Sequence, residues 1–188
     1  MNSIYIFTLK VYNNAIWENI SSWEVIIMMI RINSMRFQNI VNNYIEILND
    51  LEEDCCLYDT LKEDDKFYKQ VSNSFRNNMK EMYTIFEDYL AFSLSSVGVA
   101  VTDNKLREYI LNAYKLKIIP EDFYEFYNKT LNIRNTFAHQ YKKPTTKELV
   151  KLYKNNKSIL ENFKLFMEKR LKDNIKNNRR DLLSLYDE

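Results

Sequence analysis

Apolar residues recur every three or four positions along most of this chain, which is the pattern of helices that bury one face. The pattern predicts an all-α fold with four to five main helices and becomes regular after Met35. The positions expected to face the core are Phe37, Ile40, Val41, Tyr44, Ile45, Leu48 and Leu51, then Phe67, Val71, Phe75, Met79, Met82, Phe86, Tyr89 and Leu90, then Leu106, Tyr109, Ile110 and Ala113, then Phe123, Phe126, Tyr127, Thr130 and Leu131, and finally Leu149, Leu152, Tyr153, Leu160, Phe163 and Met167.

Local signals mark where these helices begin and end. Gly98 interrupts the second periodic stretch. Pro120 suits the first position of the fourth helix, because the N–H that proline lacks needs no partner there. Thr145 and Glu148 have the spacing of a capping box, so we expect the last helix to begin at this point.

The near-absence of glycine narrows the fold and the function. The chain has 188 residues but only one glycine and two prolines. Tight hairpins and phosphate-cradling loops both need glycines. A turn-rich β-sandwich and the Walker-type and Rossmann-type nucleotide sites are therefore excluded, which leaves a compact helical bundle as the expected architecture.

Residues 1–34 follow the helical pattern less clearly than the rest of the chain. We expect an N-terminal extension of uncertain structure over residues 1–34 and a helical bundle over residues 35–188, and the sequence leaves open whether Met35 is the true start. The most apolar stretch, Val25 to Ile30, falls far short of the ~20 residues that span a bilayer. Cys55 and Cys56 are adjacent and seldom pair, so we predict a soluble cytoplasmic protein without a metal site.

Charge is distributed unevenly although the formal net charge is only +1. Nine acidic residues and one basic residue lie between Glu46 and Asp65, whereas eleven basic and four acidic residues lie between Thr145 and Arg180. Solvated helix faces of opposite sign are the common interpretation of such a pattern. The alternative, functional interpretation is a basic surface that contacts a polyanion.

The end of the fourth helix departs from its own apolar pattern. Arg134 occupies a position that should be apolar, so its guanidinium must be paired or must face a cleft. His139 is the only histidine of the chain, and Asn135 stands four positions before it, on the same helix face. Two interpretations stay open from the residues alone: an ion pair between Arg134 and the second helix, for example with Glu87 or Asp88, or a catalytic group.

The residues Arg134, Asn135, His139 and Tyr141 form the pattern R-N-x-x-x-H-x-Y. It resembles the R-x4-H-x-Y signature of HEPN-superfamily proteins, most closely that of HepT-like toxins. The segment KLKIIPEDF before the motif and the long helix FRNNMKEMYTIFEDYLAFSL agree with that family. The resemblance covers about residues 35 to 170.

The resemblance implies a toxin that cleaves RNA without a metal or another cofactor, built as a two-fold homodimer with both motifs in one cleft. Arg134 and His139 would be the catalytic pair, and Asn135 matches the polar residue that follows the family's arginine. Tyr141 matches the tyrosine to which a cognate minimal nucleotidyltransferase antitoxin adds AMP.

Metal-free RNA cleavage needs a base, an acid and a cation for the phosphorane. A dimer supplies two copies of His139 across an isologous interface, whereas one chain has a single copy. We expect Lys142, Lys143 and the lysine-rich last helix to contact RNA phosphates. Two other functions stay open: a non-catalytic partner subunit of a minimal nucleotidyltransferase, and a structural helical dimer with an eroded site.

Overall fold

The structure is a computed structural model that describes residues 22–99, 106–138 and 144–184. This part of the chain contains five helices and no strand. The helices are α2 (Ser22–Thr60), α3 (Tyr68–Ser96), α4 (Leu106–Lys115), α5 (Glu121–Ala138) and α6 (Thr146–Ser184). The prediction of an all-α protein with four to five main helices is confirmed for the described residues.

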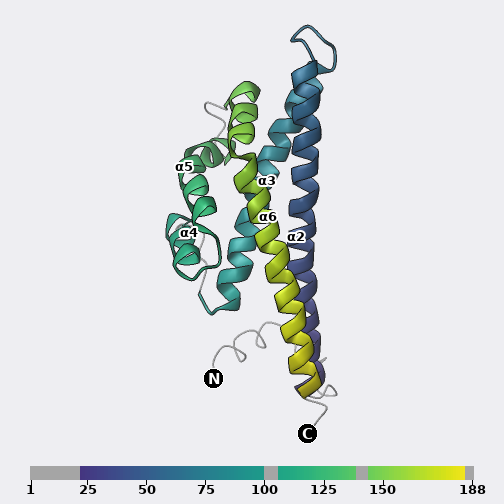
Figure 1. Ribbon diagram of the computed structural model, residues 1–188, viewed down its shortest axis with the longest axis vertical. Helices are drawn as coiled ribbons and strands as arrows, with labels where there is room; N and C mark the ends of the chain where they lie inside the picture. The colour runs from purple at the N-terminus through teal and green to yellow at the C-terminus, as the bar shows by residue number, and fades with distance from the viewer. Residues whose placement is uncertain (1–21, 100–105, 139–143, 185–188) are drawn as a thin grey trace.

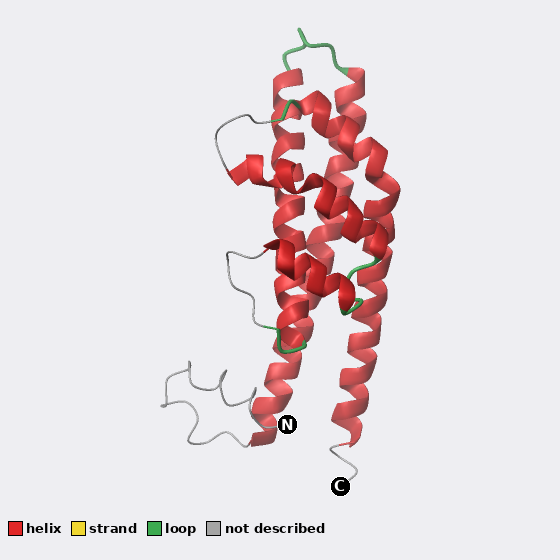
Figure 2. Ribbon diagram, turned by 90° about the vertical axis from the view of Figure 1, so that its left-hand side faces the viewer, coloured by secondary structure: helices red, strands yellow, loops and turns green. Residues whose placement is uncertain are grey.

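Three long helices form the body of the molecule (Figure 1). Helices α2, α3 and α6 run side by side, and α2 contacts both of the others. The shorter α4 and α5 lie against α3, and α5 also contacts α6. The first turns of α2 and the last turns of α6 extend beyond the other helices (Figure 2). Helix α5 is thus held on the flank of α3 and α6.

Aromatic side chains fill the core where α3, α5 and α6 meet. The rings of Phe123 and Phe163 stack with centroids 3.7 Å apart, and Phe86 lies 4.6 Å from Phe123. Two buried tyrosines have partners for their hydroxyl groups: Tyr44 donates to the carbonyl of Leu160 at 3.1 Å, and Tyr89 donates to that of Ile118 at 2.8 Å. Burial of these rings therefore leaves neither hydroxyl unsatisfied.

Most positions predicted to face the core are buried. Ile45, Leu106 and Leu152 are only half-buried. Phe67 is the clear exception, because its side chain is 50% exposed. It precedes the first residue of α3 at the α2–α3 connection, where the ammonium of Lys66 lies 4.7 Å from its ring centroid.

The expected boundary between an extension and the bundle falls inside a helix. Helix α2 begins at Ser22 and continues unbroken through residue 34 to Thr60. Ser34 donates a hydrogen bond to the side chain of Asn174 on α6 at 3.5 Å. Residues 22–34 are thus part of α2, and residues 1–21 lie outside the described part of the chain.

The predicted start of the last helix is confirmed in detail. The backbone N–H of Thr145 donates to the carboxylate of Glu148 at 2.7 Å, and the N–H of Glu148 donates to the Thr145 hydroxyl at 3.2 Å. This is the reciprocal pair of a capping box. Pro120 lies one residue earlier than predicted: α5 begins at Glu121, and the Pro120 carbonyl accepts the first helical bond, from Tyr124.

Two helix ends need a backbone conformation that favours glycine, and the chain supplies glycine at only one of them. After α3, Gly98 has φ 79°, and the N–H of Val99 bonds to the carbonyl of Leu94 at 3.0 Å. After α4, Lys117 has φ 55°, and the N–H of Ile118 bonds to the carbonyl of Ala113 at 2.8 Å. Both ends are Schellman motifs, but at the second one the left-handed backbone conformation is adopted by Lys117, for which it costs more energy than for glycine.

Replacing Lys117 with glycine should stabilise the protein. A left-handed conformation costs a non-glycine residue about 1–2 kcal/mol, part of which is offset by the greater freedom of glycine in the unfolded chain. We expect Lys117→Gly to raise the free energy of unfolding by about 0.5–1 kcal/mol in chemical denaturation. The control Lys115→Gly, in the last turn of α4, should lower it by about 1 kcal/mol. A Lys117→Gly variant less stable than the parent would contradict the assignment.

Candidate functional site

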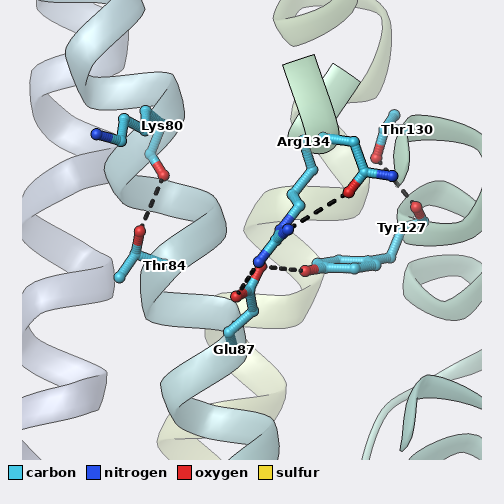
Figure 3. A network of polar contacts seen from close by, with 7 residues as sticks. Lys80, Thr84, Glu87, Tyr127, Thr130 and Arg134 are labelled. Carbon is cyan, nitrogen blue, oxygen red and sulfur yellow. Dashed lines mark hydrogen bonds and ion pairs between the residues drawn. The ribbon is translucent and has the colours of Figure 1, made fainter. Parts of the chain in front are cut away.

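Glu87 and Arg134 form an ion pair that joins α3 to α5 (Figure 3). The Nε atom of Arg134 lies 2.5 Å from one carboxylate oxygen of Glu87, and Nη2 lies 2.7 Å from the other. The hydroxyl of Tyr127 donates to the same carboxylate at 3.2 Å. Glu87 therefore accepts three hydrogen bonds from α5, two of them in the bidentate geometry that arginine favours.

The spacing of the residues on α5 explains why they meet Glu87 together. Tyr127 and Arg134 are seven residues apart, which is about two helical turns, so both side chains project from one side. Thr130 lies between them and is buried, but its hydroxyl bonds back to the carbonyl of Phe126 at 3.0 Å. It therefore does not compete for the Glu87 carboxylate.

Arg134 interrupts an apolar stripe and was predicted to be paired or to face a cleft, and the structure shows that it is paired. Of the two acidic residues considered as partners, Glu87 binds the guanidinium, and Asp88 is exposed. The contact is also the one expected of an arginine that only stabilises the fold. The geometry by itself is thus common to both interpretations left open by the sequence.

The ion pair sets the protonation states at this point. Hydrogen bonding to Glu87 is the main cause of the raised pKa of Arg134. The pKa of Tyr127 is raised first by burial and then by the negative charge of Glu87. Both shifts favour the protonated form, so both groups remain hydrogen-bond donors to the carboxylate across the neutral range.

Arg134 is fixed along one edge and keeps donors on the other. Its side chain is 30% exposed. A guanidinium has five N–H donors. Two of them bind Glu87, and one on Nη1 donates to the side-chain oxygen of Asn135 at 3.4 Å. The other two have no partner among the described residues, so they are able to bind an anion.

The structure brings together only part of the predicted site. Arg134 and the exposed Asn135 are in contact at the end of α5, which ends at Ala138. The remaining predicted site residues, His139, Tyr141, Lys142 and Lys143, lie outside the described residues, and their placement stays a prediction.

One polar group near the end of α5 was not singled out from the sequence. The hydroxyl of Tyr83 on α3 is buried and makes no hydrogen bond of normal geometry among the described residues, although the Thr130 side chain lies near it. Burial raises the pKa of Tyr83 to about 12. Its ring centroid lies 6.1 Å from that of Phe137. No sequence pattern marks this hydroxyl, because a tyrosine at such a position looks like any other core aromatic.

Three lysines of α6 are paired with acidic residues. They form ion pairs with acidic residues of α2 or of α6 itself, and the pairs are Lys154 with Asp59 at 2.5 Å, Lys157 with Glu52 at 2.6 Å, and Lys164 with Glu161. The side chain of Glu52 also accepts a hydrogen bond from the hydroxyl of Tyr153 at 3.0 Å. The opposite charges of α2 and α6 are thus partly explained by pairing between the two helices, and these three lysines are not free to bind phosphate.

No three histidine, cysteine, aspartate or glutamate side chains in the described part of the chain lie close enough together to hold a metal ion. None of the helices described here combines the length and the apolar character needed to cross a membrane.

Comparisons with protein-family models, with curated proteins and with solved structures find no match for this chain.

Removing the charge of Glu87 should destabilise the fold, because it leaves the partly buried guanidinium without its partner. We expect Glu87→Gln to lower the free energy of unfolding by about 1–3 kcal/mol, measured by urea denaturation. Asp88→Asn, the next residue of the same helix, should change it by less than about 0.5 kcal/mol. Combining Glu87→Gln with Arg134→Gln should recover part of the loss. Equal effects at positions 87 and 88 would show that the ion pair contributes nothing.

Proposed function

We propose that this chain is a toxin ribonuclease of the HEPN superfamily that cleaves RNA without a metal ion. The observation that carries the proposal is the position of Arg134. It is held at the end of α5 by Glu87, keeps two N–H donors, and stands five residues before His139, the only histidine of the chain. The all-α bundle and the proline before α5 agree with the family that the motif resembles.

In this proposal, cleavage is a transfer of the phosphoryl group within the RNA. A base removes the proton of the 2′-hydroxyl, the 2′-oxygen attacks the phosphorus, and the 5′-oxygen leaves with a proton from an acid. His139 takes part in these proton transfers, and Arg134 stabilises the extra negative charge on the phosphorane. Two histidines are available if two chains form a symmetric dimer, so we propose a two-fold homodimer with a shared cleft.

The contact with Glu87 orders the Arg134 side chain before RNA binds, which suits a residue that stabilises the phosphorane. An arginine whose side chain is already ordered loses little conformational entropy when it binds the transition state. The bidentate contact uses Nε and Nη2, and the remaining donors on Nη1 and Nη2 stay available to the phosphate. Glu87 would thus position the arginine without touching the RNA.

The second candidate function is a non-catalytic partner subunit of a minimal nucleotidyltransferase. One observation favours it: the ion pair with Glu87 accounts for Arg134 without any catalytic task. In that case Arg134 stabilises α5, and the motif forms part of a binding surface. The two functions differ in whether the positive charge of Arg134 is needed beyond its contribution to folding.

Purified protein should cleave single-stranded RNA in excess EDTA, because the proposed chemistry uses only side chains. His139→Ala and Arg134→Ala should each remove most of the cleavage, by about 100-fold or more, as expected when an acid, base or charge-stabilising group is lost. Cleavage is measured on a labelled oligonucleotide, and circular dichroism checks that the variants remain helical. Activity that disappears with EDTA and returns with a divalent metal would contradict the mechanism.

The double variant Glu87→Gln/Arg134→Gln separates the two tasks of the arginine. It removes both charges of the pair but keeps hydrogen-bonding groups on both helices. If it recovers stability and remains inactive, the charge of Arg134 is used in catalysis. If it recovers stability and cleaves RNA, Arg134 is structural and its catalytic assignment is wrong.

Tyr141 should be the point of control by a cognate minimal nucleotidyltransferase. Its hydroxyl oxygen would attack the α-phosphate of ATP, with release of pyrophosphate and of the phenolic proton. The added AMP would place an anion where the RNA phosphate must bind. We expect co-expression to add AMP to Tyr141 and to abolish toxicity.

Tyr141→Phe should fold, stay toxic and escape this neutralisation, whereas Tyr124→Phe on α5 should be neutralised like the parent. Mass spectrometry of the Tyr141 peptide checks the modification directly. Silenced toxicity with no AMP on that peptide would mean that the antitoxin acts by binding alone.

A further inference from the structure

One side of α3 carries cations and almost no acids. Positions separated by three or four residues lie on the same side of a helix. On the side of α3 that bears Glu87, such positions are occupied by polar or basic residues over more than four turns. We call this the cationic side of α3, and its members are Lys69, Asn73, Arg76, Lys80 and Thr84.

Contacts at two positions along α3 show what this side of the helix faces. Near the start of α6, Nε of Arg76 donates to the hydroxyl of Thr146 at 3.0 Å. Three turns further along α3, Glu87 binds Arg134 of α5. Arg76 and Glu87 are thus about 16 Å apart along the helix. The side of α3 that includes Arg76 and Glu87 therefore adjoins the end of α5 and the start of α6, the two points that the motif-bearing connection joins in sequence.

The charges on this side are unpaired. Lys69 and Lys80 are exposed and have no ion pair among the described residues, and Arg76 has one hydrogen bond for its five donors. The side chain of Lys80 extends away from the Arg134–Glu87 pair (Figure 3). The acidic residues Glu81 and Asp88 project about 100° or more away around the helix. Nothing described on this side neutralises the three cations, in contrast to the paired lysines of α6.

We propose that the cationic side of α3 binds the phosphate backbone of single-stranded RNA next to the cleavage site. The proposal rests on the proposed ribonuclease function and names the surface that holds its substrate. Lys69, Arg76 and Lys80 bind phosphates, and Asn73 and Thr84 supply hydrogen bonds to phosphate or sugar oxygens, as such side chains do in nucleic-acid complexes. Together with Arg134, the cations extend over about 27 Å of α3, the rise of eighteen residues.

The placement of the cations favours a nucleic acid over an acidic protein partner. The exposed positions of this side are polar throughout and offer no large apolar side chain, whereas protein interfaces have an apolar centre. A row of separated cations instead matches a polymer with one charge per repeat. Such a surface binds without regard to sequence and leaves the choice of cleavage point to the site at Arg134.

The test measures RNA binding apart from cleavage. Full-length His139→Ala is titrated into a fluorescein-labelled single-stranded oligouridine of about 20 nucleotides, and anisotropy is followed between 50 and 300 mM salt. Lys69→Gln and Lys80→Gln are then introduced together into this protein, and they break no contact in the described part of the chain. They should reduce the magnitude of the slope of log binding constant against log salt concentration by about 1.4, or about 0.7 per lost contact. If the two lysine contacts contribute nothing to the binding constant at 1 M salt, their loss should weaken binding about 25-fold at 0.1 M salt.

Two further variants of the same His139→Ala protein control for net charge. Lys154→Gln/Lys157→Gln also removes two positive charges, but from lysines of α6 that are paired with acidic residues of α2. This variant should leave the salt slope unchanged. Asn73→Lys adds a cation to the proposed surface and should strengthen binding about fivefold at 0.1 M salt. This gain keeps the test informative if a loss variant unfolds.

Two results would overturn the proposal, and they are distinguishable. If the Lys69/Lys80 variant binds as tightly and with the same slope as its parent, RNA does not use this surface, and cleavage by the wild-type protein still decides the ribonuclease function separately. If the parent binds no RNA and the wild type cleaves none, the ribonuclease function itself is wrong, and this surface has no RNA substrate to hold.

Discussion

The packing of Phe86, Phe123 and Phe163 fixes the height of α5 along α3 and α6, and the candidate site depends on it. The Phe123 and Phe163 rings are nearly parallel, at 9°, and Phe86 meets Phe123 at 73°. Phe86 immediately precedes Glu87 on α3, and Tyr127 lies one turn after Phe123 on α5. The contact that buries the rings therefore also brings the Tyr127 hydroxyl and the Arg134 guanidinium to the Glu87 carboxylate. A shift of α5 by one turn, about 5.4 Å, would separate all of these pairs together.

A chain with one glycine can form these helix ends because it uses other devices. The capping box of Thr145 and Glu148 satisfies two N–H groups at the start of α6. The hydrogen bond from the Thr145 N–H is the main cause of the lowered pKa of Glu148. The cap therefore contributes its full stability above the ordinary pKa of a glutamate and loses it as the pH falls through the lowered pKa of Glu148. At the end of α4, Lys117 adopts the left-handed conformation that Gly98 adopts at the end of α3. These helix ends therefore form with a single glycine among them.

Periodicity predicted the helices and most of the core because burial of one helix face is a local property of the sequence. It could not predict how the helices pair. The charge runs of α2 and α6 suggested either solvated faces or a polyanion surface, and only the packing shows that Lys154 and Lys157 meet Asp59 and Glu52 across the α2–α6 contact. The sequence did identify Arg134 as a residue that must be paired or must face a cleft. It could not choose between Glu87 and Asp88, which are neighbours in sequence but lie about 100° apart around α3.

The Arg134–Glu87 pair also bears on how an anion would be attracted to this region. A carboxylate 2.5 and 2.7 Å from the guanidinium cancels most of its charge at long range, so the pair acts as a dipole that an approaching phosphate senses only when close. Long-range attraction then has to come from cations without partners. Among the described residues near the end of α5 and the start of α6, the cations without an ion pair are Arg76 and Lys80 on α3 and Lys147 and Lys151 on α6, while Lys154 and Lys157 are paired. Helix α3 would therefore combine two roles: its carboxylate orients the one arginine that acts at short range, and its cations supply part of the field that brings a polyanion to it.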